Sequence, residues 1–242
     1  MLILNLGCGT RTAEHPDVLN IDWSLNIRIK KSRLLRLAAA PLLDGRRRAR
    51  LDQMAGKLLA HDLSKGIPFA SDTVDIVYHS HVLEHLDRPV ARQFLREALR
   101  VLKPGGICRI VVPDLEFACR AYVQHIERCK QEPSETAVHE QFVEEILEQS
   151  VRRQAAASIG RRGLRRIVDQ LVLGDARRRG ETHQWMYDRI SLPYLLNESG
   201  YGNVEVQAWN SSRIPGWDAI GLDRNADGGE YTPNSLYVEA QK

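Results

Sequence analysis

The stretch LILNLGCGT at residues 2–10 decides the fold. An apolar run of strand length passes directly into Gly7 and Gly9, and glycine lets the backbone turn sharply and approach a ligand at the carboxyl end of a strand. A second run, VLNID at residues 18–22, ends in Asp22, whose carboxylate can accept hydrogen bonds from both hydroxyls of a ribose. These two features predict a nucleotide-binding α/β domain.

Further apolar runs of strand length alternate with helical segments, which is typical of a parallel sheet covered on both faces. Residues 88–101 have apolar side chains at helical spacing and are followed by the turn Lys103-Pro104-Gly105-Gly106. We expect seven strands, at residues 2–6, 18–22, 58–62, 74–79, 107–112, 203–208 and 234–240.

The size and composition fit one globular domain. The chain has 242 residues, with 43% hydrophobic and 27% charged residues, and its mean hydropathy is −0.35. These values exclude a disordered, collagen-like or coiled-coil protein. The longest apolar stretch, around Pro41, is far below the roughly 20 residues that cross a bilayer.

The cysteines and the first residues indicate a reducing compartment. MLILNLGCG has none of the features of a signal peptide. Cys8, Cys108, Cys119 and Cys129 lack paired close spacing, so neither a disulfide framework nor a zinc cluster is predicted. We therefore expect a cytoplasmic protein.

Positive charge is concentrated in residues 28–57 and 151–179, although the net charge is only +3. Each basic segment is interpreted either as a solvated helical face or as a surface for an anionic substrate or membrane headgroups. Both lie in stretches, 24–57 and 115–180, that interrupt the alternation and are predicted to be helical lid insertions within a single domain, 1–242. Residues 25–50 could instead form an amphipathic helix lying on anionic lipid.

The order of the motifs resembles that of the class I S-adenosylmethionine-dependent methyltransferases. The chain reads LNLGCG, NID, HDL with GIPF, VDIVYHSHVLEHL and RVLKPGGICRIVVPD over residues 2–114. It is most similar to the small-molecule branch with a VLEH motif, some members of which act in glycan or natural-product pathways. Residues 183–201 and the final SLYVEAQK are similar to that family's last helix and hairpin. The resemblance implies a Rossmann-like, doubly wound sheet with strand order 3-2-1-4-5-7-6 and an antiparallel last strand.

The resemblance also implies which residues hold S-adenosylmethionine. The glycine bend would contact the amino-acid part, the end of the second strand the ribose, the end of the third strand the adenine, and His79 the sulfonium. The residues concerned are Leu6, Gly7, Cys8, Gly9, Asp22 with the adjacent Trp23, Asp62, Leu63 and His79.

A histidine is the natural base for removing the proton of a hydroxyl acceptor, because imidazole titrates near neutrality. Our order of preference is His81, then His183, then His79. His85 is interpreted as structural, together with Glu84, and a metal at His81 and His85 is disfavoured because no third ligand is evident. Asp114 and Glu116 are alternative bases or helix caps.

The predicted reaction moves a methyl group to an oxygen of a small molecule, in preference to a nitrogen or carbon. The acceptor is expected to be a sugar or a glycan-pathway intermediate, including a lipid-linked one. Alternatives are a nucleic-acid methyltransferase using the arginine-rich segments and a catalytically silent cofactor-binding module. An NAD-dependent enzyme is disfavoured because the third glycine is missing where Arg11 follows Thr10.

Overall fold

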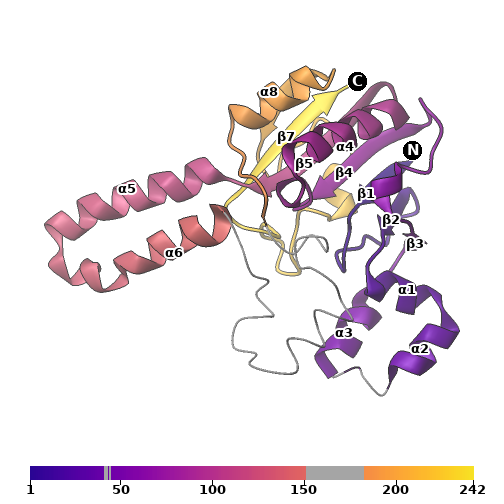
Figure 1. Cartoon of the computed structure of the whole chain (residues 1–242), viewed down its shortest axis with the longest axis horizontal. Coiled ribbons are helices and arrows are strands. Elements are labelled where there is room, and N and C mark those ends of the chain that lie inside the picture. Colours follow the sequence, from indigo (N-terminus) through magenta and orange to yellow (C-terminus); the bar gives the residue numbers. More distant parts are fainter. Residues whose placement is uncertain (41–42, 44, 151–182) are drawn as a thin grey trace.

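A computed structural model describes residues 1–40, 43, 45–150 and 183–242 (Figure 1). The second basic run of the sequence, from Arg161 to Arg179, lies outside the described residues. Among the described residues no helix has the length and apolarity to cross a bilayer.

The centre of the molecule is a seven-stranded sheet with the order β3-β2-β1-β4-β5-β7-β6 (Figure 1). β1 to β5 pair in parallel, and β7 is antiparallel to both of its neighbours. The predicted strand order and the antiparallel last strand are therefore confirmed. The strands are β1 (Ile3–Leu6), β2 (Val18–Asp22), β3 (Lys57–Ala60), β4 (Val74–Ser80), β5 (Leu102–Pro113), β6 (Gly202–Gln207) and β7 (Ser235–Gln241).

Two strand boundaries differ from the prediction by more than one residue. β3 ends at Ala60, so Asp62 lies beyond the strand rather than at its last position. β5 begins at Leu102 and includes the predicted turn, and its register with β4 shifts between Val74 and Ile76. Pro104 and the two glycines that follow it predicted a separate turn, but they form an irregular part of strand β5.

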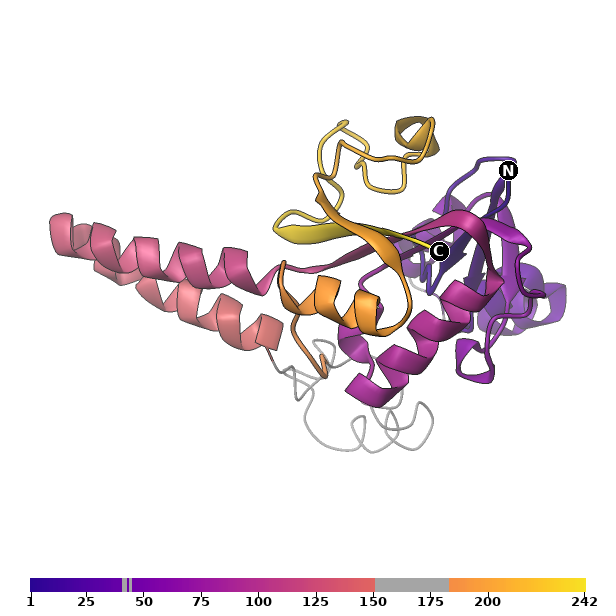
Figure 2. The ribbon, with the colours of Figure 1, turned by 90° about the horizontal axis from the view of Figure 1, so that it is seen from above.

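Each face of the sheet has a different cover (Figure 2). α4 (Arg88–Val101) and α8 (Ser191–Glu198) pack on one face. α4 lies there because Ala91, Leu95 and Ala98 recur at helical spacing and are fully buried. The connection between β6 and β7, which includes the short helix α9 (Trp217–Ile220), covers the other face.

The remaining helices form two groups. α1 (Leu25–Lys31), α2 (Arg33–Ala39) and α3 (Gly45–Gln53) lie beside the β3 edge. α5 (Leu115–Gln131), the 3-10 turn η4 (Pro133–Val138) and α6 (His139–Ser150) form a hairpin that projects from the body (Figures 1 and 2). These helices occupy the predicted insertions, and their action as lids stays a prediction.

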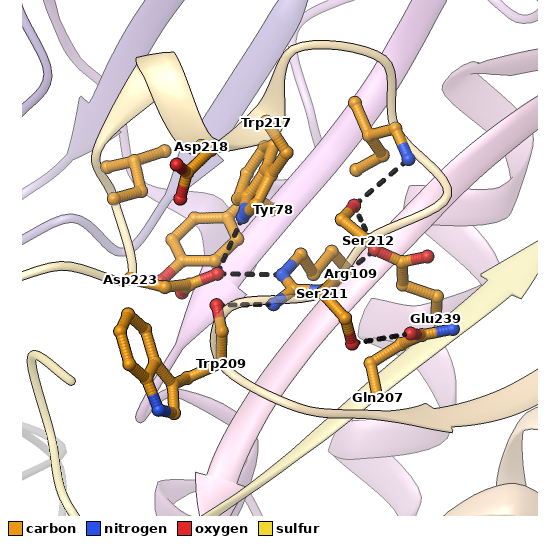
Figure 3. A network of polar contacts seen from close by, with 12 residues as sticks. Tyr78, Arg109, Gln207, Trp209, Ser211, Ser212, Trp217, Asp218, Asp223 and Glu239 are labelled. Atoms are coloured by element: carbon orange, nitrogen blue, oxygen red, sulfur yellow. Dashed lines mark hydrogen bonds and ion pairs between the residues drawn. The ribbon is translucent and has the colours of Figure 1, made fainter. Parts of the chain in front are cut away.

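A buried ionic network joins the sheet to the β6–β7 connection that covers one of its faces (Figure 3). Arg109 of β5 is fully buried, and its guanidinium contacts Asp223 and Glu239, each at 2.7 Å. Asp223 also accepts hydrogen bonds from the Tyr78 hydroxyl at 2.7 Å and the Trp217 indole at 2.6 Å. Every charge in the network is therefore paired, which is the condition under which ions tolerate burial.

We predict that Asp223→Asn destabilises the fold strongly. The substitution leaves the Arg109 charge buried with one carboxylate fewer, and removing one partner of a buried ion pair typically costs about 3 kcal/mol or more. Asp218→Asn is the matched control, since Asp218 is 61% exposed in its pair with Arg224, and we expect it to cost about 0.5 kcal/mol or less. Urea unfolding followed by circular dichroism measures both; equal midpoints for the two variants would contradict the prediction.

Candidate active site

The glycine bend after β1 has the conformation that the sequence indicates. Gly7 and Gly9 have φ of +63° and +53°, in the left-handed region that favours glycine. A Cβ on Gly7 would lie 2.6 Å from Val82, whereas a Cβ on Gly9 would meet no atom within 4 Å. Gly7 is thus required by packing, and Gly9 borders open space where a ligand can approach the backbone.

Asp22 holds this bend in place from the end of β2. One of its carboxylate oxygens accepts a hydrogen bond from the Gly9 amide at 2.8 Å, and the other accepts from the Ser24 amide. A carboxylate has about four lone-pair positions. Asp22 can therefore organise the loop and still accept hydrogen bonds from a bound hydroxyl.

The predicted cofactor residues next to the bend differ in how far they are exposed. Leu6 and Cys8 are buried, and Cys8 packs in the apolar cluster under α1 and α3. Burial, followed by the nearby Asp22 charge, raises the pKa of the Cys8 thiol far above its usual range. Trp23 is half exposed beneath the Arg28 guanidinium, 4.9 Å from its ring centre.

Asp62 caps the 3-10 turn η2 (Leu63–Lys65) rather than ending β3. It accepts hydrogen bonds from the Ser64 hydroxyl at 2.7 Å and the Ser64 amide at 3.1 Å. The bond from the hydroxyl is the main cause that lowers the pKa of Asp62. The amide of His61 donates to the Asp22 carbonyl at 3.2 Å, so the start of this turn stays beside the end of β2.

His79 is enclosed by the core at the end of β4. It is fully buried, packs edge-on against Phe94 with ring centres 5.1 Å apart, and has no hydrogen-bond partner among the described residues. Burial lowers its pKa to about 4, so the ring is neutral at physiological pH. The predicted roles of His79 stay predictions, and its imidazole has no exposed surface in this structure.

His81 has the geometry of a general base. Its Nδ1 lies 3.1 Å from Oε1 of the fully buried Glu84, and its Nε2 lies 3.2 Å from the Ser235 hydroxyl. Because a carboxylate only accepts, Nδ1 carries the proton and Nε2 presents its lone pair to the hydroxyl. The backbone of His81 has φ of +54°, which is uncommon for a residue other than glycine.

Glu84, which the sequence indicates only as a structural residue, is the ionic partner of His81. It lies in the 3-10 turn η3 (Leu83–His85). Burial alone would raise its pKa, but the hydrogen bond from His81 and the nearby His81 and His85 rings hold the pKa of Glu84 below its ordinary value. The ionised carboxylate can therefore stabilise a proton taken up by His81.

The predicted base His183 lies beside His85, with ring centres 4.9 Å apart in an edge-to-face arrangement. The chain is held there by the amides of Gln184 and Trp185, which both donate to the Glu84 carbonyl. Ligand-capable atoms of Glu84, His85 and His183 lie within 4.8 Å of one another. This group contains His85 and His183 but not His81, so it differs from the His81 and His85 pair that the sequence offered for a metal.

Asp114 and Glu116 behave as structural groups at the start of α5. Asp114 caps the helix and accepts from the Glu116 amide at 3.0 Å. Glu116 pairs with Arg120 at 2.6 Å and also with Arg189. Burial raises the pKa of Asp114.

A cavity of about 420 Å³ lies at the base of the α5–α6 hairpin, within the usual size range of small-molecule sites. Asp114, which lines the cavity, donates its amide to the Asn234 carbonyl, and the next residue, Ser235, contacts His81. The lining of the cavity combines charged side chains with the Phe117 and Phe142 rings. The lining residues include Asp114, Glu116, Phe117, Arg120, Gln124 and Arg189.

Residues 30–110 match the family model of a methyltransferase domain. The match covers about a third of the chain and includes His81 and Glu84, whereas the glycine bend lies before it. No curated protein matches this sequence.

Solved structures with a distantly similar fold include three S-adenosylmethionine-dependent methyltransferases. A protein from Methanosarcina mazei is 16% identical, with 99% of this chain and 91% of that chain covered and a TM-score of 0.47. A possible histamine N-methyltransferase from Thermotoga maritima is 11% identical, covers 100% and 82%, and has a TM-score of 0.44. The 1,6-didemethyltoxoflavin N1-methyltransferase of Burkholderia thailandensis, solved with its substrate and S-adenosylhomocysteine, is 12% identical, covers 100% and 70%, and also has a TM-score of 0.44. Similarity at this level does not identify a substrate.

We predict that Glu84→Gln lowers the free energy of unfolding by about 2 kcal/mol at pH 7, the usual worth of a buried hydrogen bond to a charged group. The pKa of Glu84 is lower in the folded chain than its ordinary value of 4.5. The carboxylate's contribution is therefore complete above about pH 5 and is lost as the pH falls through the folded pKa.

Urea unfolding of the wild-type and variant chains between pH 7 and pH 3 measures this effect, and the difference should shrink toward the acidic end. Glu198→Gln, on the exposed end of α8, is the control and should show no such pH dependence. A Glu84→Gln difference that stayed constant with pH would mean that Glu84 is uncharged in the folded chain.

Proposed function

We propose that this chain is an S-adenosylmethionine-dependent methyltransferase that methylates an oxygen of a small, hydroxyl-rich acceptor, a sugar or glycan-pathway intermediate. The observation that carries the proposal is the contact between two parts of the site. The glycine bend packs against Val82, and the adjacent residue, His81, presents a lone pair backed by the buried Glu84. A ligand on the bend would therefore lie next to a base.

The residues of the bend fit the cofactor. Gly9 has open space where a side chain would stand, Asp22 has lone pairs left for ribose hydroxyls, and Asp62 and Leu63 lie on the adjacent turn as candidates for the adenine. When bound, S-adenosylmethionine supplies a methyl group on a sulfonium that is already a strong electrophile. The protein is then left to align the acceptor, exclude water and remove a proton.

His81 is the residue best suited to remove that proton. In the structure its Nε2 faces the Ser235 hydroxyl, which marks where the hydroxyl of an acceptor can be placed. His81 takes the proton at Nε2, while Glu84 accepts from Nδ1 and stabilises the resulting imidazolium, as the acid does in other hydroxyl–imidazole–carboxylate arrangements. Glu84 is thus a positioning residue that acts through His81.

The cavity at the base of the hairpin supports a carbohydrate-like acceptor. Its carboxylates and guanidinium groups suit a molecule with many hydroxyls, and the Phe117 ring offers an apolar face. The cavity borders Asp114, whose amide donates to the residue before Ser235. An acceptor there would reach toward His81 from the hairpin side.

An acceptor linked to lipid is compatible with the surface of α2. Leu34 and Leu37 are 80% and 73% exposed and alternate with Arg33 and Arg36. Apolar side chains beside basic ones suit the surface of a membrane with anionic lipid. We therefore propose that residues 25–50 make peripheral contact with a membrane.

The proposed compartment is the cytoplasm. The four cysteines are all unpaired in the described residues, although Cys119 is exposed and available to an oxidant. Free thiols are typical of a reducing environment.

Gly9→Ala should weaken the binding of S-adenosylmethionine by about tenfold or more, because a methyl group would occupy the open space at the bend and a 1.4 kcal/mol loss already corresponds to a factor of ten. Gly216→Ala is the matched control, since Gly216 also has positive φ and open space around its Cβ position but lies in the β6–β7 connection. Both substitutions impose the same kind of backbone strain. Isothermal titration calorimetry with S-adenosylmethionine measures both affinities. Equal affinities of the two variants would contradict binding of the cofactor at the bend.

His81→Asn should leave the cofactor affinity unchanged and slow methyl transfer by about 100-fold or more, the usual contribution of a general base. Asparagine tolerates the left-handed backbone, so the loop is preserved. The assay follows labelled methyl groups from S-adenosylmethionine into acceptors in cell extract, separated into water-soluble, lipid and polynucleotide fractions.

Label in the water-soluble or lipid fraction supports the proposal, and the lipid fraction would identify the lipid-linked form. Label in polynucleotide would favour a nucleic-acid methyltransferase. Cofactor binding without label in any fraction would identify a silent binding module. Full turnover by His81→Asn would show that His81 is not the base.

A further inference from the structure

The α5–α6 hairpin has very little apolar core of its own. In α5 only Ala118 and His125 are buried, and the described residues of α6 through Leu147 are exposed or half-buried. The two helices nevertheless lie side by side and project from the body (Figures 1 and 2). A histidine is thus the largest buried side chain of α5, near the tip of the projection.

Three metal-ligating side chains meet at that tip. His125 and Cys129 are four residues apart in α5 and so share one helix face, and His139 begins α6. The two Nδ1 atoms of the histidines lie 2.9 Å apart, and the Cys129 sulfur lies 3.4 Å from Nδ1 of His125. All three ligand atoms lie within 4.8 Å of one another.

Neighbouring groups fix these rings in place. Oε2 of Glu135 lies 3.3 Å from Nε2 of His125 in an ion-pair contact. A proton on Nε2 leaves the Nδ1 lone pair directed at Cys129 and His139. The His125 ring is stacked on Phe142 with centres 4.1 Å apart, and His139 packs on Tyr122 at 5.3 Å. A carboxylate behind a histidine is the usual outer partner of a zinc-ligating imidazole.

We propose that His125, Cys129 and His139 bind one zinc ion, which closes the tip of the hairpin. Two imidazole nitrogens and a thiolate are ligands that zinc prefers. With Zn–N of about 2.0 Å and Zn–S of about 2.3 Å, a tetrahedral site requires N···N and N···S separations of about 3.3 and 3.5 Å. The two separations at His125 are therefore within about 0.4 Å of these values, and the Cys129 sulfur lies within 4.8 Å of a His139 nitrogen.

The fourth position of the site faces outward. Cys129 and His139 are half-buried, so a water molecule can complete the tetrahedron there. The Glu135 carboxylate and the Cys129 thiolate together balance the two positive charges of the ion. The bound ion would link α5 to α6 directly and add to the stack of His125 on Phe142, which already joins the two helices.

The test uses cobalt(II) as a probe for zinc in the full-length, reduced protein. A thiolate ligand gives cobalt a charge-transfer band in the near ultraviolet, and a tetrahedral site gives intense visible bands. We expect both, saturating at one equivalent and displaced by zinc. The cluster of Glu84, His85 and His183 contains no thiol and cannot produce the charge-transfer band.

Cys129→Ser should remove the charge-transfer band, and Cys119→Ser is the matched control on the exposed side of the same helix. His139→Asn should weaken zinc binding by at least 100-fold, and Glu135→Gln by about 10-fold to 100-fold, in competition with a chromophoric chelator. Circular dichroism verifies that each variant keeps its helices. Zinc should also slow amide hydrogen exchange in α5 and α6 of the wild-type chain.

The proposal is overturned if no charge-transfer band forms, or if the band survives in Cys129→Ser and disappears in Cys119→Ser. It is also overturned if zinc binds His139→Asn as tightly as the wild-type chain. In either case the two histidines form only a hydrogen-bonded pair.

Discussion

The hydrogen bond from the Gly9 amide to Asp22 is the interaction on which the arrangement of the site depends. It joins the bend after β1 to the end of β2 and keeps both glycines in left-handed conformations. Because Gly7 then packs directly on Val82, the bend also fixes the turn that follows β4. One carboxylate thereby aligns the glycine bend with the turn that carries His81, the proposed base.

The buried network on the opposite face of the sheet fixes the other side of the same site. Arg109 pairs with Glu239 across the β5–β7 ladder, and these two residues are also direct neighbours in its register. Ser235 begins the same strand β7 and faces His81. A shift in the register of β7 would separate the Arg109 and Glu239 charges and move the Ser235 hydroxyl away from the His81 imidazole. The ion pair thus helps to hold the contact at the other end of the strand.

The sequence was sufficient for the fold because apolar runs, glycine bends and the apolar spacing of residues 88–101 predict the α/β class, and the resemblance to the class I methyltransferases implies the strand order that the sheet has. It was insufficient for contacts between distant segments. Ser235 is 154 residues from His81, and no local pattern indicates such a pairing. Asp62 was expected to end a strand, but its side chain is better satisfied by capping Ser64. The sequence does not predict the cluster of His125, Cys129 and His139, because its cysteines lack paired close spacing and its one local clue is a histidine and a cysteine at i and i+4.

The backbone of His81 carries a further consequence for how this chain evolves. A left-handed φ at a residue other than glycine lowers stability by about 1 kcal/mol or more. Glycine at this position would remove that strain but would not supply an imidazole. Descendants of this protein that no longer needed the reaction would gain by drifting to glycine or asparagine at position 81. If His81 is the base as proposed, the residue at this position separates relatives that keep the reaction from relatives that have lost it.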